Sequence, residues 1–129
     1  MIFKPELAEA ILRGEKTATR RKFSDNRRSP WWEHGCSYMV GQVFTINPGR
    51  GVPRVGEARV TAVYSEPLGH MVEADALKEG FRPEGTATAL AAFDESWETI
   101  NGEYFADEAV WVIEFELVGE HQQVVGRAA

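Results

Sequence analysis

The chain has 129 residues, 43% hydrophobic and 26% charged, which is enough for one domain with its own core. That composition argues against a disordered, collagen-like or coiled-coil protein, and a single cysteine excludes an intramolecular disulfide. The net charge of −6 divides into +5 over residues 1–60 and −11 over residues 61–129. An acidic total argues against non-specific coating of duplex DNA. A local basic face fits a small anionic ligand or a short single strand, although unevenly charged solvated surface gives the same pattern.

Two further features bear on where the protein works. No run of 18 apolar residues occurs, so we expect no membrane span. The N-terminal segment is amphipathic and contains Glu6 and Glu9, unlike a secretory signal peptide. We therefore expect a cytoplasmic protein.

The chain opens with a predicted helix that is followed by a strand. Pro5 suits the first turn of a helix, and Gly14 is a natural C-terminal stop. Between them, an apolar stripe is formed by Leu7, Ile11 and Leu12. Residues 16–23 alternate and contain two threonines, which favours an extended strand.

The middle of the chain predicts a loop and two strands. Residues 24–40 carry several breakers and are expected to form a loop. Residues 41–46 predict a short strand, and the Pro-Gly pair after it predicts a turn. Residues 57–65 predict another strand, one face of which would carry Ala58, Val60, Ala62 and Tyr64.

The remaining chain predicts two helices and a last strand. Residues 73–79 suit a short helix that ends at Gly80, and residues 86–100 suit a longer helix capped by Thr86. Helical spacing connects Leu90, Phe93, Trp97 and Ile100, and the solvated face would carry Asp94, Glu95 and Glu98. Residues 109–118 predict a strand whose apolar face would carry Ala109, Trp111, Ile113, Phe115 and Leu117. We assign six of these residues to the core and none of them to a functional site: Leu90, Phe93, Trp97, Trp111, Ile113 and Phe115.

The order of elements predicts the fold class. Strands and helices do not alternate regularly, so a parallel doubly wound sheet is not expected. A small, mostly antiparallel barrel with helices packed against it fits better, which makes the fold α+β. We expect one domain over residues 1–118 and a polar tail over residues 119–129.

The densest polar chemistry lies between the first helix and the first strand. No nucleotide-binding or metal-binding signature of the common kinds occurs in the sequence. Lys16 and Thr19 could form a base and nucleophile pair, because a threonine hydroxyl needs a neighbour to take its proton. A lysine can do so only if burial or nearby cations lower its pKa. The alternative is an ordinary polar strand that faces solvent.

Four landmarks in order resemble the ASCH domain family. The first is a helix-ending glycine with a Lys-Thr-x-Thr segment and a downstream arginine, here Gly14, Lys16, Thr17, Thr19 and Arg21. The others are a Gly-x-Val strand start (residues 41–43), an acidic residue before Gly-Phe (residues 79–81) and a Trp-Val-Ile-x-Phe strand (residues 111–115). Together they span nearly the whole chain.

The resemblance implies a fold and an activity. The fold would be a PUA-like barrel of five or six strands with flanking helices. Small bacterial members are amidohydrolases that deacetylate N4-acetylcytidine without a metal or cofactor. Carried over to this chain, their catalytic residues fall on Lys16, Thr19 and Glu79. We expect Thr17, Arg20 and Arg21, which lie beside them in the sequence, to bind the substrate. Thr19 would attack the acyl carbonyl, Lys16 would move the proton, and Glu79 would hold Lys16.

The sequence does not determine whether the pKa of Lys16 is raised or lowered at this predicted site. A glutamate paired with Lys16 raises the pKa of that lysine, whereas burial and neighbouring arginines lower it. The chain also departs from the small amidohydrolases at Arg20, where they have an apolar residue, and in a longer 24–40 loop.

That loop carries the alternative function. It interleaves basic and aromatic side chains (Arg27, Arg28, Trp31 and Trp32), which is how proteins contact single-stranded RNA. Other family members are discussed as RNA-binding or RNA-cleaving modules. One or both tryptophans could instead cap the open end of the barrel core. Adjacent residues of an extended segment point to opposite faces, so one can pack inward while the other is exposed.

Histidine and cysteine do not predict a metal centre. His34 and Cys36 are two residues apart, and His70 and His121 are isolated. A zinc site needs three or four ligands in fixed geometry. We therefore expect no metal. From the resemblance and the 24–40 loop, we expect the binding partner to be a modified cytosine nucleoside or single-stranded RNA.

Overall fold

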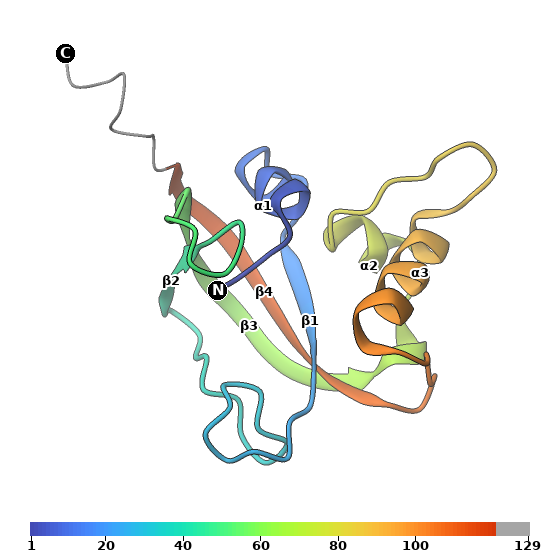
Figure 1. Ribbon diagram of the computed structural model, residues 1–129, viewed down its shortest axis with the longest axis horizontal. Coiled ribbons are helices and arrows are strands. Elements are labelled where there is room, and N and C mark those ends of the chain that lie inside the picture. The colour runs from blue at the N-terminus through green and yellow to red at the C-terminus, as the bar shows by residue number, and fades with distance from the viewer. Residues whose placement is uncertain (121–129) are drawn as a thin grey trace.

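The computed structural model describes residues 1–120 of the chain (Figure 1). Within them lie three α-helices, one short 3-10 helix and four strands. The helices are α1 (Pro5–Leu12), η1 (Leu68–His70), α2 (Glu73–Lys78) and α3 (Ala89–Asn101). The strands are β1 (Ala18–Lys22), β2 (Val43–Ile46), β3 (Gly56–Pro67) and β4 (Ala109–Glu120). Each predicted element is present, with shifted ends.

The four strands form one antiparallel sheet in the order β1-β4-β3-β2. The long strands β3 and β4 curve across the molecule, so the sheet is a half-barrel (Figure 1). The α+β class is confirmed, but the expected count of five or six strands is wrong for residues 1–120.

The N-terminal segment explains the difference in strand count. Residues 1–3 pair with Asn47, just after β2, through one parallel bridge and two backbone hydrogen bonds of 2.9 and 3.0 Å. On the β1 side, Arg21 donates a 2.8 Å hydrogen bond to the carbonyl oxygen of Ile2. The segment therefore partly fills the gap between the two sheet edges, but it is too short to form a strand.

Two hydrophobic cores lie on opposite faces of β4. Ile113 and Phe115 pack in the first core, with α1 and β2, as the predicted apolar face requires. Val110 and Val112 are also fully buried, in a second core with α2 and α3. Alternate residues of a strand point to opposite faces, so β4 is buried on both faces where one was predicted.

A β-bulge changes the predicted alternation of β3. Val60 pairs with Phe115 and Ala62 pairs with Glu114, which leaves Thr61 as the extra residue. After the bulge, Val63 continues the face of the first core, and Tyr64 is exposed. The prediction of one continuous face through Tyr64 is therefore wrong. The bulge also directs Glu66, opposite Val110, to the face of the second core.

Helix α3 begins three residues later than the sequence predicted. The hydroxyl of Thr88, and not of Thr86, accepts a 3.0 Å hydrogen bond from the backbone of Ala91. The carboxylate of Glu73 in α2 accepts two more, both 2.9 Å, from the first two backbone amides of α3. These contacts fix α2 against α3 and so set the position of Glu79, which follows α2.

The C-terminal end of the described chain differs slightly from the expectation. Strand β4 runs to Glu120, two residues beyond the predicted strand end. The rest of the predicted polar tail, with His121, lies outside the described residues. No helix within residues 1–120 has the length and apolar character needed to cross a bilayer.

Candidate active site

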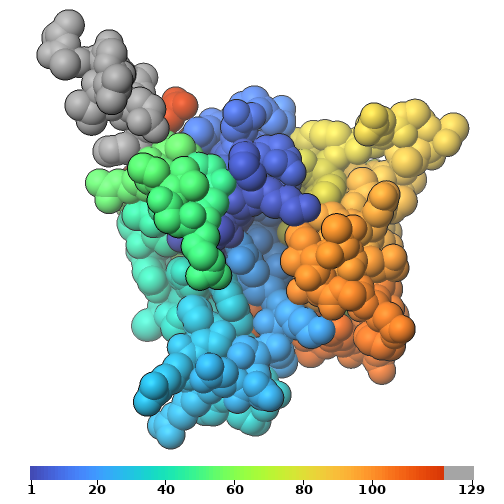
Figure 2. All heavy atoms as spheres, viewed as in Figure 1, coloured from blue at the N-terminus to red at the C-terminus, as the bar shows by residue number. Residues whose placement is uncertain are grey.

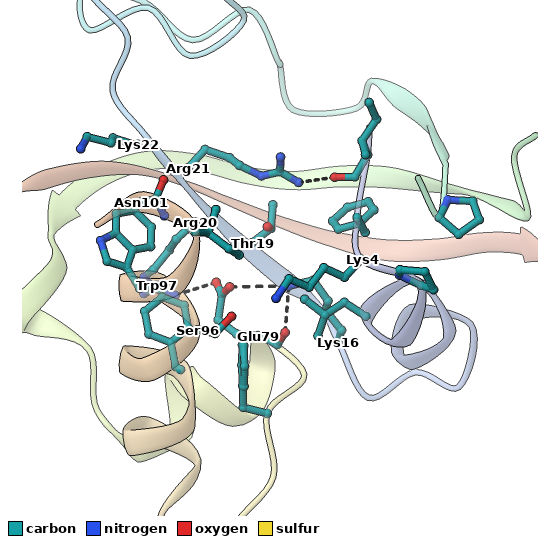
Figure 3. A pocket seen from close by; sticks show the side chains of 18 of the residues that line it. Lys4, Lys16, Thr19, Arg20, Arg21, Lys22, Glu79, Ser96, Trp97 and Asn101 are labelled. Atoms are coloured by element: carbon teal, nitrogen blue, oxygen red, sulfur yellow. Dashed lines mark hydrogen bonds and ion pairs between the residues drawn. The ribbon is translucent and has the colours of Figure 1, made fainter. Parts of the chain in front are cut away.

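A cavity of about 570 Å³ opens beside the free edge of β1. Its walls come from the N-terminal segment, β1, residues 79–81 and one side of α3 (Figure 3). Figure 2 shows the same face of the molecule, on which β1 lies between the green 47–55 loop and the orange α3. Lys16, Thr19 and Glu79 all line this cavity, so the fold brings the three residues together.

Lys16 is buried in the segment that joins α1 to β1. Its side chain is only 2% exposed. The Nζ atom donates to the carbonyl oxygen of Ala18 at 2.7 Å and to that of Glu79 at 2.8 Å. The Oε1 atom of the Glu79 carboxylate lies 3.5 Å from the same nitrogen. The reading of this segment as an ordinary strand that faces solvent is therefore wrong.

Glu79 reaches the cavity because α2 ends there. It is the C-cap residue of α2, and Gly80 turns the chain with a φ of +98°. A Cβ atom on residue 80 would lie 3.1 Å from the Cβ of Lys16, closer than most such contacts. Glycine thus permits both the turn and the close approach of the two segments.

Arg20 lies on the opposite side of the Glu79 carboxylate from Lys16. Its guanidinium donates a 3.0 Å hydrogen bond to Oε2 of Glu79 and also pairs with Glu66 in β3 (Figure 3). The Arg20 side chain is 2% exposed. The charges therefore alternate along the series Lys16–Glu79–Arg20–Glu66, of which only Glu66 is partly exposed.

The structure decides the sign of the pKa shift that the sequence left open. Burial lowers the pKa of Lys16 from its ordinary value, the attraction of Glu79 opposes this, and nearby Arg21 adds to the lowering. The net direction is downward. A larger fraction of Lys16 is therefore neutral, and able to accept a proton, than of an exposed lysine at the same pH.

Thr19 occupies the middle of β1, where it is 4% exposed and lines the cavity. It pairs with Ile113 of β4. Within residues 1–120 its hydroxyl makes no hydrogen bond of its own. The hydroxyl is therefore available to a molecule that enters the cavity.

The backbone of β1 also faces the cavity. The carbonyl of Ala18 is bound by Lys16, not by β4, so residue 18 directs its backbone groups to the free edge. Residues two apart in an antiparallel strand share this orientation. The backbone N–H of Arg20 therefore points to the same open edge, next to Thr19.

Arg21 is held between two aromatic rings. Its guanidinium carbon lies 5.3 Å from the ring centre of Phe3 and 5.4 Å from that of Trp31. Contacts of this kind fix the guanidinium plane by cation–π attraction. Arg21 and Trp31 both line the cavity.

The sequence missed the apolar wall of this cavity. Phe81, Phe93, Trp97 and Ile100 line it, and the last three form a stripe on α3. Phe93 and Trp97 do belong to the second core, as predicted, but they also face the cavity. The indole nitrogen of Trp97 is buried without a hydrogen-bond partner within residues 1–120. Ile100, at the end of this stripe, is exposed. Nothing in the sequence distinguished it from the core positions of the same helix.

Several predicted residues lie outside the cavity. Thr17 is exposed and contributes only backbone hydrogen bonds, to Lys78 and from Phe115. Arg27 and Arg28 are exposed in the 24–40 loop. Trp32 is half-buried there, and its carbonyl oxygen accepts a 3.0 Å hydrogen bond from the indole of Trp111. Trp31, in contrast, stacks on Tyr38 and reaches the first core, so adjacent tryptophans have different surroundings.

Histidine, cysteine and carboxylate side chains do not gather in the part of the chain that the structure describes. Residues 1–120 contain no group of three or more of them placed to hold a metal ion. His34 contacts Glu33 at 3.4 Å, and Cys36 packs against the first core.

The fold and the cavity define a small α+β domain with a curled antiparallel sheet and a buried charge network at its edge. A model of the ASCH domain family matches residues 1–119, so the chain belongs to the ASCH domain family. No curated protein matches the chain.

Solved structures of this type share the fold. A protein from Enterococcus faecalis aligns with a TM-score of 0.64 at 19% identity, over 91% of this chain and 72% of that one. An ASCH domain from Lactobacillus crispatus aligns with a TM-score of 0.57 at 21% identity, over 89% and 71% of the two chains. An ASCH protein from Zymomonas mobilis aligns with a TM-score of 0.57 at 16% identity, over 95% and 71%. These neighbours fit a PUA-like fold.

Proposed function

We propose that the protein is a metal-independent amidohydrolase that removes the acyl group from N4-acylated cytosine nucleosides such as N4-acetylcytidine. The observation that carries this proposal is the buried Lys16, which has a lowered pKa and lies in one cavity with the free hydroxyl of Thr19. A base and a nucleophile in a shared cavity are what acyl transfer requires.

The hydrogen bonds of Lys16 suit a proton acceptor. A neutral amine has two N–H bonds and one lone pair, and two carbonyl oxygens already accept from this nitrogen. In the neutral form those bonds occupy both hydrogens and leave the lone pair unused. The lone pair takes the proton of Thr19 as the hydroxyl oxygen attacks the acyl carbonyl carbon.

Lys16 and Thr19 also carry out the remaining steps of the reaction. The tetrahedral intermediate collapses with cleavage of the C–N bond, and protonated Lys16 gives its proton to the departing cytosine N4. The acyl group is then an ester of Thr19. Water attacks this ester with Lys16 again as base, which releases the carboxylic acid and restores the hydroxyl.

Glu79 acts as a positioning residue in this scheme. Its carboxylate lies 3.5 Å from the Lys16 nitrogen, so it stabilises the ammonium that forms after each proton transfer. Arg20 binds the other carboxylate oxygen at 3.0 Å and keeps it in place. The free backbone N–H of Arg20 is the group that we assign to the developing oxyanion, because it is next to Thr19 at the open edge of β1.

The apolar wall suits a flat base. Phe81 and Trp97 lie on the α2–α3 side of the cavity, and aromatic faces bind nucleobases by stacking. A cytosine ring against this wall would present its exocyclic amide to Thr19.

The direct experiment is hydrolysis of N4-acetylcytidine, followed by chromatography of substrate and cytidine. We expect turnover by the wild-type protein and its loss, by at least about 100-fold, in Lys16→Ala and Thr19→Val. Lys78→Ala, an exposed lysine beside the site, is the matched control. Full activity of Lys16→Ala would disprove the mechanism, and no turnover by the wild type would disprove the substrate.

A second candidate function rests on the 24–40 loop. The Arg27 guanidinium lies 5.9 Å from the ring centre of Trp32, on an exposed segment, which is an arrangement that binds single-stranded RNA. Binding of this kind weakens steeply as salt rises. Trp32→Ala should then abolish RNA binding and leave hydrolysis of the free nucleoside unchanged.

A further inference from the structure

The charged side chains around the cavity are unbalanced. Among residues 1–120, five cationic residues line it, against a single carboxylate, that of Glu79. The cationic residues are Lys4, Lys16, Arg20, Arg21 and Lys22. The whole chain has a net charge of −6, so this excess is local to the cavity.

The buried cations already have partners. Lys16 and Arg20 share Glu79, and Arg20 also pairs with Glu66. They cannot contribute a free charge to a ligand without breaking these pairs. The excess therefore belongs to the other three residues.

Of those three, Lys4 and Lys22 are exposed and Arg21 is partly buried, and all three are weakly paired. Within residues 1–120, neither Lys4 nor Arg21 makes an ion pair with a carboxylate. Lys22 is half exposed and approaches Glu108 only to 3.8 Å. Of the five N–H donors of its guanidinium, Arg21 uses one for a hydrogen bond to a residue of the described chain, Ile2.

Arg21 is also held ready for an anion. The rings of Phe3 and Trp31 fix its guanidinium, so little side-chain freedom is lost when a ligand binds. Thr19 and Arg21 lie on the same side of β1, roughly 7 Å apart along the strand. In Figure 3, Arg21 lies beyond Thr19 as seen from Glu79.

We propose that the cavity contains a phosphate subsite formed by Arg21 and Lys4, so that the substrate is a phosphorylated nucleoside. This inference rests on the proposed function for the acylated base and adds the phosphate to it. The apolar wall takes the base, Thr19 takes the acyl group, and the rim of the cavity takes the phosphate. The phosphate belongs either to a free nucleotide or to an RNA strand.

Binding measurements test the subsite without any catalysis. Calorimetry would compare cytidine with its 5′- and 3′-monophosphates for the wild type, Arg21→Gln and Arg54→Gln. We expect at least about tenfold tighter binding of one monophosphate, since a charge-assisted hydrogen bond is gained. Arg21→Gln should reduce this ratio towards one. Arg54→Gln, which removes an exposed charge away from the cavity, should preserve it. Equal binding of nucleoside and nucleotides by the wild type would overturn the subsite.

Kinetics separate this proposal from the proposed function. The ratio of kcat/KM for the acetylated monophosphate over N4-acetylcytidine should exceed about tenfold and fall in Arg21→Gln and Lys4→Gln. Turnover of both substrates with no preference would overturn the subsite and keep the deacylase. Tight monophosphate binding without turnover would keep the subsite and overturn the deacylase. An oligonucleotide with one internal N4-acetylcytidine tells the sources apart, because it outcompetes the mononucleotide only if the phosphate belongs to RNA.

Discussion

The carboxylate of Glu79 stands between Lys16, 3.5 Å from its Oε1, and Arg20, 3.0 Å from its Oε2. Lys16 precedes Glu79 by 63 positions, and all three side chains are almost fully buried. A single carboxylate thus serves two cations that are four residues apart at the edge of β1. The balance of these charges sets the protonation of Lys16.

Replacing Glu79 with glutamine should lower the pKa of Lys16 further. The attraction of Glu79 raises that pKa, and glutamine is neutral, so burial and Arg21 remain unopposed. The acidic limb of the kcat/KM profile, where activity rises as Lys16 loses its proton, should move to lower pH, even though the maximal rate falls. NMR titration of the Lys16 Cε resonance measures the same shift without turnover. A Lys16 titration that moves to higher pH in the variant would contradict this account.

Lys16 should also make stability depend on pH. Its pKa is lower in the folded state, so between that pKa and the unfolded value of 10.5 the unfolded chain binds more protons. Stability should therefore rise with pH across this window. The difference in unfolding free energy between wild type and Lys16→Met, measured by urea denaturation at several pH values, isolates the effect. A difference that does not change with pH would show that the lysine titrates normally.

Arg20→Gln should destabilise the protein strongly and reduce activity. The substitution removes the cation that pairs with both Glu66 and Glu79. Removing one partner of a buried ion pair lowers the free energy of unfolding by about 3–5 kcal/mol. The matched control is Arg59→Gln, which breaks an exposed pair with Glu116 and should cost less than about 1 kcal/mol. Chemical denaturation measures both. Equal losses in the two variants would mean that the Arg20 network adds nothing beyond a surface ion pair.

Gly80→Ala should reduce activity by more than its loss of stability explains. The new methyl group would meet the Lys16 side chain at 3.1 Å in a backbone conformation that alanine avoids. Gly102→Ala has a comparable φ of +86° and open space around it, so it reports the backbone strain without the contact. We expect both variants to lose stability and only Gly80→Ala to lose activity, as measured by melting and hydrolysis assays. Comparable activity in both would show that Lys16 tolerates displacement.

The sequence by itself determined the helices and strands, and it placed Lys16 close to Thr19. Pro5, Gly14 and Gly80 mark helix ends through local backbone preferences, and these hold in any tertiary setting. Lys16 and Thr19 are close in any fold because they are three residues apart. The four landmarks, in their order along the chain, also indicated the ASCH domain family, which the family model confirms.

The tertiary structure decided the charges and the walls. The sequence predicted that Arg20 binds substrate but not that it pairs with Glu66, 46 positions away. A bulge at Thr61 turns Glu66 to the face where the two side chains meet. Trp97 packs in the second core as predicted, yet it also lines the cavity. Burial, and with it the direction of the Lys16 pKa shift, depends on contacts between distant segments. No local sequence pattern contains that information. One extra residue in a strand, such as Thr61, moves every following side chain to the other face of the sheet, and the sequence pattern does not reveal where such a residue lies.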